Sequence, residues 1–142
     1  MLISQVIKDK GDIVFTVSPG ERLANAAALL HGRQVGSAVV LDSSGAVVGL
    51  VSERDVVRLL ALDGAAALER PVSDAMTREV VLARPDETID AILARMTDRR
   101  VRHLPVVLEG RLLGLVSIGD LVKRKIAETE AEARELKAYI AA

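Results

Sequence analysis

Apolar residues recur along this chain with two different spacings. Short apolar runs bounded by Gly, Pro, Asp or Ser predict β-strands, which we place at Ile13–Val17, Ala38–Leu41, Val47–Val51, Val80–Leu82, Leu104–Leu108 and Leu112–Val116. An alanine- and leucine-rich segment predicts a helix over Leu23–Leu30. A further helix is predicted by apolar residues spaced i, i+3, i+4 and i+7 along one helical face, namely Ile89, Ile92, Leu93 and Met96. Two more helices are expected to begin after Ser52 and after Ser117.

The order of these elements repeats because the sequence itself repeats. At an offset of 66 residues, Pro19-Gly20-Glu21 aligns with Pro85-Asp86-Glu87, and one residue dropped in a turn then changes the offset to 65. From there Gly49 to Val57 aligns with Gly114 to Val122, with six of these nine positions identical. The sequence therefore predicts two copies of one β-α-β-β-α unit.

The alignment also sets the expected domain boundaries. We assign residues 6–63 to the first copy, 64–77 to a connector, 78–127 to the second copy and 128–142 to a C-terminal helical extension. The connector joins an alanine-rich helix end to a segment with Pro and Asp, which favours an ordered connection over a flexible linker. Since each copy is too small for a full core, we expect the copies to pack sheet against sheet around a shared core. The predicted fold class is mixed α+β, with a long C-terminal helix.

Composition narrows the chemistry that this fold can carry. The 142 residues include no cysteine, two histidines and two aromatic residues, Phe15 and Tyr139, and their formal net charge is −1. Without cysteine there is no disulfide, thiolate metal site or Cys nucleophile, and we predict no metal site. The near-neutral charge and the shortage of aromatics argue against nucleic-acid binding, and a bound planar ring is expected between aliphatic side chains. No signal peptide or membrane-spanning segment is predicted, so the expected location is the cytoplasm.

Both copies carry a Ser-x-x-Asp motif after Gly-Leu-Val, formed by Ser52 with Asp55 and by Ser117 with Asp120. One interpretation is structural, because this spacing approximates a capping box at a helix N-terminus. A functional interpretation uses the same geometry, since a hydroxyl and a carboxylate one turn apart suit the vicinal hydroxyls of a ribose and would repel phosphate. The two interpretations are compatible, because the cap can orient the carboxylate that binds the sugar.

The ordered set of motifs resembles a stand-alone protein of two tandem CBS domains (cystathionine beta-synthase domains). The resemblance spans about Val6 to Ile140 and rests on these motifs: Gly49-Leu50-Val51-Ser52-Glu53-Arg54-Asp55, Met76-Thr77, Arg102-His103-Leu104-Pro105-Val106 and Gly114-Leu115-Val116-Ser117-Ile118-Gly119-Asp120. It implies a pseudo-twofold module with two clefts for adenosine-containing ligands: AMP most of all, or ATP, ADP, NAD(H) or S-adenosylmethionine. No further cofactor is implied.

By family position, Ser52 with Asp55 and Ser117 with Asp120 would hold two riboses. The resemblance places the base against Val14, Thr16, Ser37 and Ala38 in one cleft, and against Val80, Leu82, His103 and Leu104 in the other. The copies differ between Ser and Asp, with Glu53-Arg54 in one and Ile118-Gly119 in the other, so we expect unequal sites.

Phosphate groups need donors, and arginine matches phosphate oxygens with two parallel hydrogen bonds. Arg54 and Arg102 flank the expected clefts and are the candidates. No nucleophile with a matching base is evident, so we do not expect an enzyme. The expected function is a nucleotide sensor that signals to an unidentified effector protein by changing conformation.

The C-terminal segment is free of Gly and Pro from Asp120 onward, and small or apolar residues recur with the spacing of a helical seam, at Val122, Ile126, Thr129, Ala133, Leu136 and Ile140. A helix of this length extends beyond one half of the module, so we expect a homodimer. The alternative function is a structural or dimerisation module whose clefts are vestigial.

Overall fold

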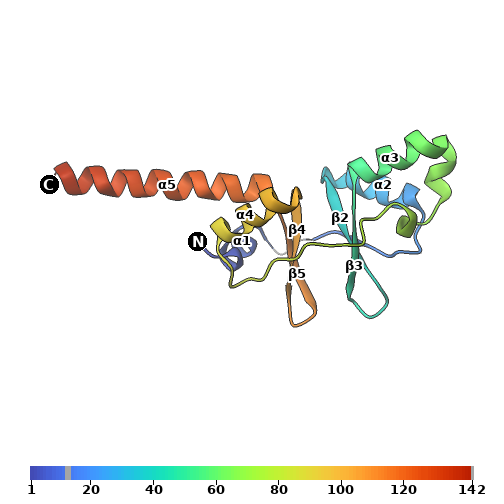
Figure 1. Cartoon of the computed structure of the whole chain (residues 1–142), viewed down its shortest axis with the longest axis horizontal. Coiled ribbons are helices and arrows are strands. Elements are labelled where there is room, and N and C mark those ends of the chain that lie inside the picture. Colours follow the sequence, from blue (N-terminus) through green and yellow to red (C-terminus); the bar gives the residue numbers. More distant parts are fainter. Residues whose placement is uncertain (12–13, 142) are drawn as a thin grey trace.

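The computed structural model describes residues 1–11 and 14–141, and the two sequence copies form two similar halves (Figure 1). The first half contains β1 (Thr16–Val17), α2 (Leu23–Arg33), β2 (Ser37–Leu41), β3 (Val47–Ser52), α3 (Glu53–Asp63) and two 3₁₀ turns, η1 (Gly64–Glu69) and η2 (Val72–Asp74). The second half contains α4 (Ile89–Arg99), β4 (His103–Leu108), β5 (Arg111–Ser117) and α5 (Ile118–Ala141). A helix that the sequence analysis did not predict, α1 (Ile3–Lys10), precedes them.

Local signals explain where these elements end. Helix α2 stops at Gln34 and α4 stops at Arg100, the equivalent position of the repeat, and both residues adopt the left-handed conformation with φ of 54° and 55°. The second hairpin turns at Glu109-Gly110, where both residues have positive φ as the tightest hairpin turns require. Ala142, the predicted last helical residue, lies outside the described residues.

The sheets keep the predicted order with one difference. In the first half β1 runs parallel to β2, and β2 pairs antiparallel with β3. In the second half β4 pairs antiparallel with β5. The predicted strand Val80–Leu82 is not a strand, because pairing there is reduced to one parallel bridge between Ala83 and Val106. That bridge is the repeat equivalent of the pairing of Val17 with Val40. Ile13, predicted to begin the first strand, lies outside the described residues.

The apolar core differs from the single shared core that we expected. Buried side chains form two clusters, one under each sheet: Ala38 and Val40 belong to the first, and Leu104 and Val106 belong to the second. Because side chains alternate along a strand, Val39 lies on the face of its sheet opposite to Ala38 and Val40, and it is buried there too. Figure 1 shows the two sheets side by side, with α2 and α3 on one outer side and α1 and α4 on the other. Each half thus has its own core, and the sheets face each other.

The N-terminal helix α1 packs against the second half. Ile3 and Val6 are fully buried in the second cluster, and the backbone N–H of Ile3 donates to the Glu87 carbonyl at 2.9 Å. In the first half, the connector fills the corresponding space, since Val72 and Ala75 are buried in the first cluster. The connector is ordered, as the sequence predicts.

Helix α5 begins against the second half and then extends away from it (Figure 1). Its first turns are tied to the body by Arg124, which pairs with Asp9 at 2.9 Å, and by Lys125, which pairs with Asp90 at 3.0 Å. None of the described helices is long and apolar enough to cross a membrane.

Candidate functional site

Each Ser-x-x-Asp motif lies where a strand passes into a helix, and each forms a capping box. The Ser52 hydroxyl accepts from the Asp55 backbone N–H at 3.3 Å, and the Asp55 carboxylate accepts from the Ser52 N–H at 2.8 Å. The Asp120 N–H donates to the Ser117 hydroxyl at 3.1 Å, and the Ser117 N–H donates to the Asp120 carboxylate at 2.9 Å. The structural interpretation of both motifs is confirmed, and each cap fixes a carboxylate at the start of a helix.

The two halves build the junction between hairpin and helix in the same way. The first helical residue after each serine donates its N–H to the carbonyl just before the first strand of the hairpin: Glu53 to Gly36 at 3.0 Å, and Ile118 to Arg102 at 2.8 Å. These contacts place the start of each hairpin beside the cap of the following helix. Two clefts result, and both are lined by Gly36 and His103.

The first cleft has a volume of about 330 Å³ and contains the first capping box. Its lining residues come from both halves and comprise Gly36, Leu50, Ser52, Glu53, Arg54, Asp55, Thr77, Arg102 and His103. Four of the predicted ribose and phosphate residues therefore meet here. Asp55 is buried, and its carboxylate also accepts from the Arg58 guanidinium at 3.3 Å.

The second cleft has a volume of about 190 Å³. It is lined by Lys10, Val14, Phe15, Val35, Gly36, Ser37, His103, Leu115 and Ser117. Asp120 lies behind Ser117 and accepts from the Lys10 ammonium at 2.7 Å. Burial opposes ionisation of Asp120, but the hydrogen bonds from Lys10 and Ser117 outweigh it and hold the pKa of this carboxyl below its usual value. An ionised carboxylate thus lies next to two residues of the second cleft, Lys10 and Ser117, although Asp120 itself is not among the residues that line the cleft.

Two further polar groups of the second cleft stand out. The Ser37 hydroxyl is buried and has no hydrogen-bond partner among the described residues. An unpaired buried hydroxyl is costly, and most such groups in proteins are paired. Burial, and then the charge of Lys10, lowers the pKa of His103, so its imidazole is neutral at pH 7.

Several residues that the resemblance assigns to base binding line neither cleft. Ala38 and Leu104 are fully buried in the two apolar clusters. Thr16 and Leu82 are exposed, and Val80 is half-buried outside the cleft linings. Val14, Ser37 and His103 line the second cleft together. The expected separation of His103 from the other two is therefore wrong, because His103 borders both clefts.

Lys10, Phe15 and Thr77 line the clefts, although none of them was predicted to be a site residue. Phe15 changes one expectation, because an aromatic ring lies at the second cleft and is covered on one side by Arg33, at 5.3 Å from the ring centroid. A bound ring there need not sit among aliphatic side chains alone. The i, i+3, i+4 spacing of Ile3, Val6 and Ile7 is the signal that could have revealed α1, but not where Lys10 would lie.

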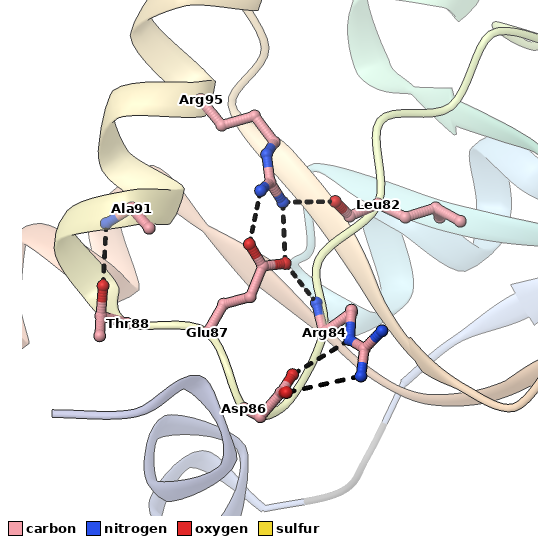
Figure 2. A network of polar contacts seen from close by, with 7 residues as sticks. All are labelled: Leu82, Arg84, Asp86, Glu87, Thr88, Ala91 and Arg95. Atoms are coloured by element: carbon pink, nitrogen blue, oxygen red, sulfur yellow. Dashed lines mark hydrogen bonds and ion pairs between the residues drawn. The ribbon is translucent and has the colours of Figure 1, made fainter.

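The acidic residues before α4 have a structural role (Figure 2). Glu87 pairs with Arg95, and the same guanidinium donates to the Leu82 carbonyl at 2.9 Å. The hydrogen bond from Arg95 is the main reason why the pKa of Glu87 lies below its usual value. Thr88 caps α4 by accepting from the Ala91 N–H at 3.1 Å. This network holds the segment that leads into the second half, away from both clefts.

Within residues 1–11 and 14–141, no three His, Asp or Glu side chains are grouped so that they could hold a metal ion. The polar side chains in and beside the clefts offer hydrogen bonds and charge: carboxylates accept, hydroxyls both donate and accept, and Lys and Arg carry positive charge.

Comparison with known proteins agrees with this architecture. The CBS domain family matches residues 10–62 and 72–126, so the chain belongs to the CBS domain family and holds two copies of that domain. The mitochondrial CBS domain-containing protein CBSX3 of Arabidopsis thaliana is 31% identical, with 97% of this chain and 71% of that protein covered.

Solved structures share the fold. The CBS-domain containing protein ATU1752 from Agrobacterium tumefaciens is 42% identical, with a TM-score of 0.83 over 87% of this chain and 92% of that one. The CBS domain pair of protein MJ0100, solved in complex with 5′-methylthioadenosine and S-adenosyl-L-methionine, is 22% identical, with a TM-score of 0.80 over 90% and 98% of the two chains. The mixed α+β fold of a tandem CBS pair, predicted from the sequence, is confirmed.

Proposed function

We propose that this protein is a non-enzymatic sensor of adenosine-containing ligands, which bind in the two clefts. The observation that carries the proposal is the buried Ser37 hydroxyl at the second cleft, which has no hydrogen-bond partner in the part of the chain that the structure describes. A ligand amine or ring nitrogen would satisfy it, since a hydroxyl can donate as well as accept. Val14 and His103 line the same cleft and would contact the base with Ser37.

The two carboxylates are the proposed ribose ligands. Asp55 and Asp120 are each oriented by a capping box, so their acceptor oxygens are fixed before a ligand arrives. Such preorganisation lowers the entropic cost of binding. In the first cleft, Arg54 and Arg102 line the wall and would bind phosphate oxygens.

The ligand class follows from these groups. A ribose and an adenine are common to AMP, ATP, ADP, NAD(H) and S-adenosylmethionine. The arginines of the first cleft suit a phosphate, which favours the first four over S-adenosylmethionine, and of these we propose AMP first. The MJ0100 complex supports the class, because a chain of the same fold holds two adenosyl compounds.

Signalling would follow from the place of the clefts between the halves. Gly36 and His103 border both clefts, so a ligand in either one would change the contacts between the two sheets. A partner protein would respond through different affinities for the free and bound forms.

We also propose that α5 pairs with the same helix of a second copy, in parallel. Its apolar stripe is open along the helix: Val122 is 42% exposed, Ile126 54%, Leu136 60% and Ile140 74%. In a parallel pair, Glu132 and Lys137 flank the apolar stripe at positions that face each other across the two helices. Each helix supplies one of each, so two complementary ion pairs form, one on either side of the stripe.

The dimer is tested by sedimentation of wild type, Leu136→Asp and a control, Ala138→Asp, which adds the same charge on another face of α5. We expect wild type and the control to be dimers and Leu136→Asp to be a monomer. A dimer in all three proteins, or a monomer in all three, would contradict the proposal.

The ligand proposal is tested by native mass spectrometry of the purified protein, followed by calorimetric titration of the stripped protein with AMP, ATP, NAD and S-adenosylmethionine. We expect a co-purifying or titrating adenosyl compound with at most two bound per chain. The exposed stripe of α5 favours one other candidate, a dimerisation module without a ligand. A stable dimer that binds none of the four compounds at millimolar concentration would favour that candidate.

A further inference from the structure

Helix α1 brings a cation from the start of the chain to the second cleft. The Lys10 ammonium, at the end of this helix, donates to the Leu115 carbonyl at 2.9 Å and to the Asp120 carboxylate at 2.7 Å. The burial of Ile3 and Val6 in the second core fixes the helix, so packing sets where the backbone of Lys10 lies.

The two clefts hold their carboxylates in different ways. In the first cleft the cation beside Asp55 is Arg58, which belongs to the same helix and also donates to the Ala75 carbonyl at 2.8 Å. In the second cleft the cation comes from an element 110 residues away, and it lines the cleft itself. Arg58 is absent from the lining of the first cleft. The repeat therefore accounts for the carboxylates but not for Lys10.

Lys10 competes with a sugar that uses both carboxylate oxygens of Asp120. Both Lys10 and the Ser117 N–H donate to the same oxygen, Oδ2 of Asp120. A ribose that binds this carboxylate through both of its vicinal hydroxyls uses both oxygens, so it would have to share Oδ2 with Lys10 or displace the ammonium. Because the lysine stem is flexible and its ammonium has three donors, the ammonium can move to another anion nearby.

The remaining lining of the second cleft offers no comparable cation. Among the described residues that line it, Lys10 alone carries a permanent positive charge, since His103 is neutral at pH 7. An anionic group of a ligand in this cleft would therefore meet Lys10 first.

We propose that Lys10 determines the specificity of the second cleft for a ligand with a 5′-phosphate. The ammonium moves from Asp120 to the phosphate and leaves the carboxylate free for the ribose. Lys10 then binds the phosphate of the ligand, and Asp120 binds its ribose. A nucleoside without phosphate provides no anion to which Lys10 could move, so its second ribose hydroxyl has to compete with Lys10 for Oδ2 of Asp120. This inference rests on the proposed function, because it assumes that the clefts bind adenosyl ligands.

The test is a calorimetric titration with AMP and with adenosine, in the full chain carrying Asp55→Ala so that binding reports on the second cleft. Four proteins are compared: this background alone, and with Lys10→Met, Lys10→Arg or Lys8→Met. Lys8 is an exposed lysine of the same helix, so Lys8→Met removes the same charge away from the cleft. Thermal unfolding checks that each protein is folded.

We expect Lys10→Met to weaken AMP binding about tenfold to a hundredfold, the usual effect of losing a hydrogen bond to a charged group. Adenosine binding should stay equal or become tighter, because Asp120 loses its competitor. Lys10→Arg should keep the preference for AMP, and Lys8→Met should change neither ligand. Equal losses for AMP and adenosine, or an unchanged AMP affinity, would overturn the inference.

Other outcomes separate this inference from the proposed function. If the wild type binds AMP but the Asp55→Ala background binds neither compound, the second cleft takes no ligand, and this inference fails while the first cleft remains a binding site. If the wild type binds no adenosyl compound, the proposed function fails and this inference fails with it.

Discussion

Gly49 is the position where one methyl group should have the largest effect on packing. It lies on β3, facing the connector, and an alanine Cβ there would come within 2.5 Å of Met76 Sδ, 2.9 Å of Met76 Cγ and 3.1 Å of the Thr77 carbonyl oxygen. The side chain can shift, but the carbonyl is held, because Thr77 and Leu50 exchange two backbone hydrogen bonds of 2.9 and 3.0 Å. Gly49→Ala therefore forces the connector away from the strand.

The cost is that of overpacking a filled site, about 1–3 kcal/mol. For a chain of this size, each kcal/mol lowers Tm by about 2–4 °C, so Gly49→Ala should lower Tm by about 2–12 °C. The suitable assay is thermal unfolding followed by far-ultraviolet circular dichroism, since the chain has no Trp. Met76→Ala in the same chain should recover part of the loss, and the double-mutant cycle gives the coupling between the two positions.

Gly32 supplies the matched control. It lies within α2, and an added Cβ would meet nothing within 4 Å. Gly32→Ala should therefore leave stability equal or raise it by up to about 1 kcal/mol, because alanine is the better helix former. If Gly49→Ala and Gly32→Ala gave the same Tm, or if Met76→Ala added its full cost to that of Gly49→Ala, the packing argument would be refuted.

Two pH-dependent effects follow from single groups. Because Arg95 lowers the pKa of Glu87, the ion pair stabilises the fold above about pH 4.5, and this contribution is lost as the pH falls through the lowered pKa. Glu87→Gln should thus cost about 1 kcal/mol at pH 7 and progressively less as the pH falls below about 4.5, and a constant Tm difference would contradict this. Because burial lowers the pKa of His103, the unfolded chain takes up a proton first, and stability falls as the pH drops below about 6.5. His103→Gln should lose less Tm than wild type between pH 7.5 and 5.5, whereas an equal loss would show that His103 does not titrate on unfolding.

Features encoded by neighbouring residues were predictable from the sequence. The hairpins, the caps at Ser52 and Ser117, and the long C-terminal helix all depend on turn residues, caps and periodicity within a few positions. The repeat then made each assignment stronger, because the same signal had to hold twice. The predicted ribose residues Ser52 and Asp55 lie in one cleft for the same reason, since the capping box itself places them together.

Features that depend on distant contacts were not predictable. The sequence shows that Ile3 and Val6 could lie on one helical face, but not that this face packs in the second half. The contact of Lys10 with Asp120 spans 110 residues, and no local pattern encodes it. The strand predicted at Val80–Leu82 was wrong for a related reason. Apolar character alone does not create the backbone pairing with a distant segment that a strand requires.

The central claim is that the capped carboxylates bind adenosyl ligands, and calorimetric titration of AMP into four full-length proteins tests it most directly. The proteins are wild type, Asp55→Ala, Asp120→Ala and the control Asp98→Ala, which removes an exposed carboxylate of α4. We predict that wild type and Asp98→Ala bind AMP alike. Each of the other two variants should either lose one of the binding sites or bind AMP at least tenfold more weakly. Unchanged AMP binding in both Asp55→Ala and Asp120→Ala, or no binding of AMP or any other adenosyl compound by wild type at millimolar concentration, would contradict the account.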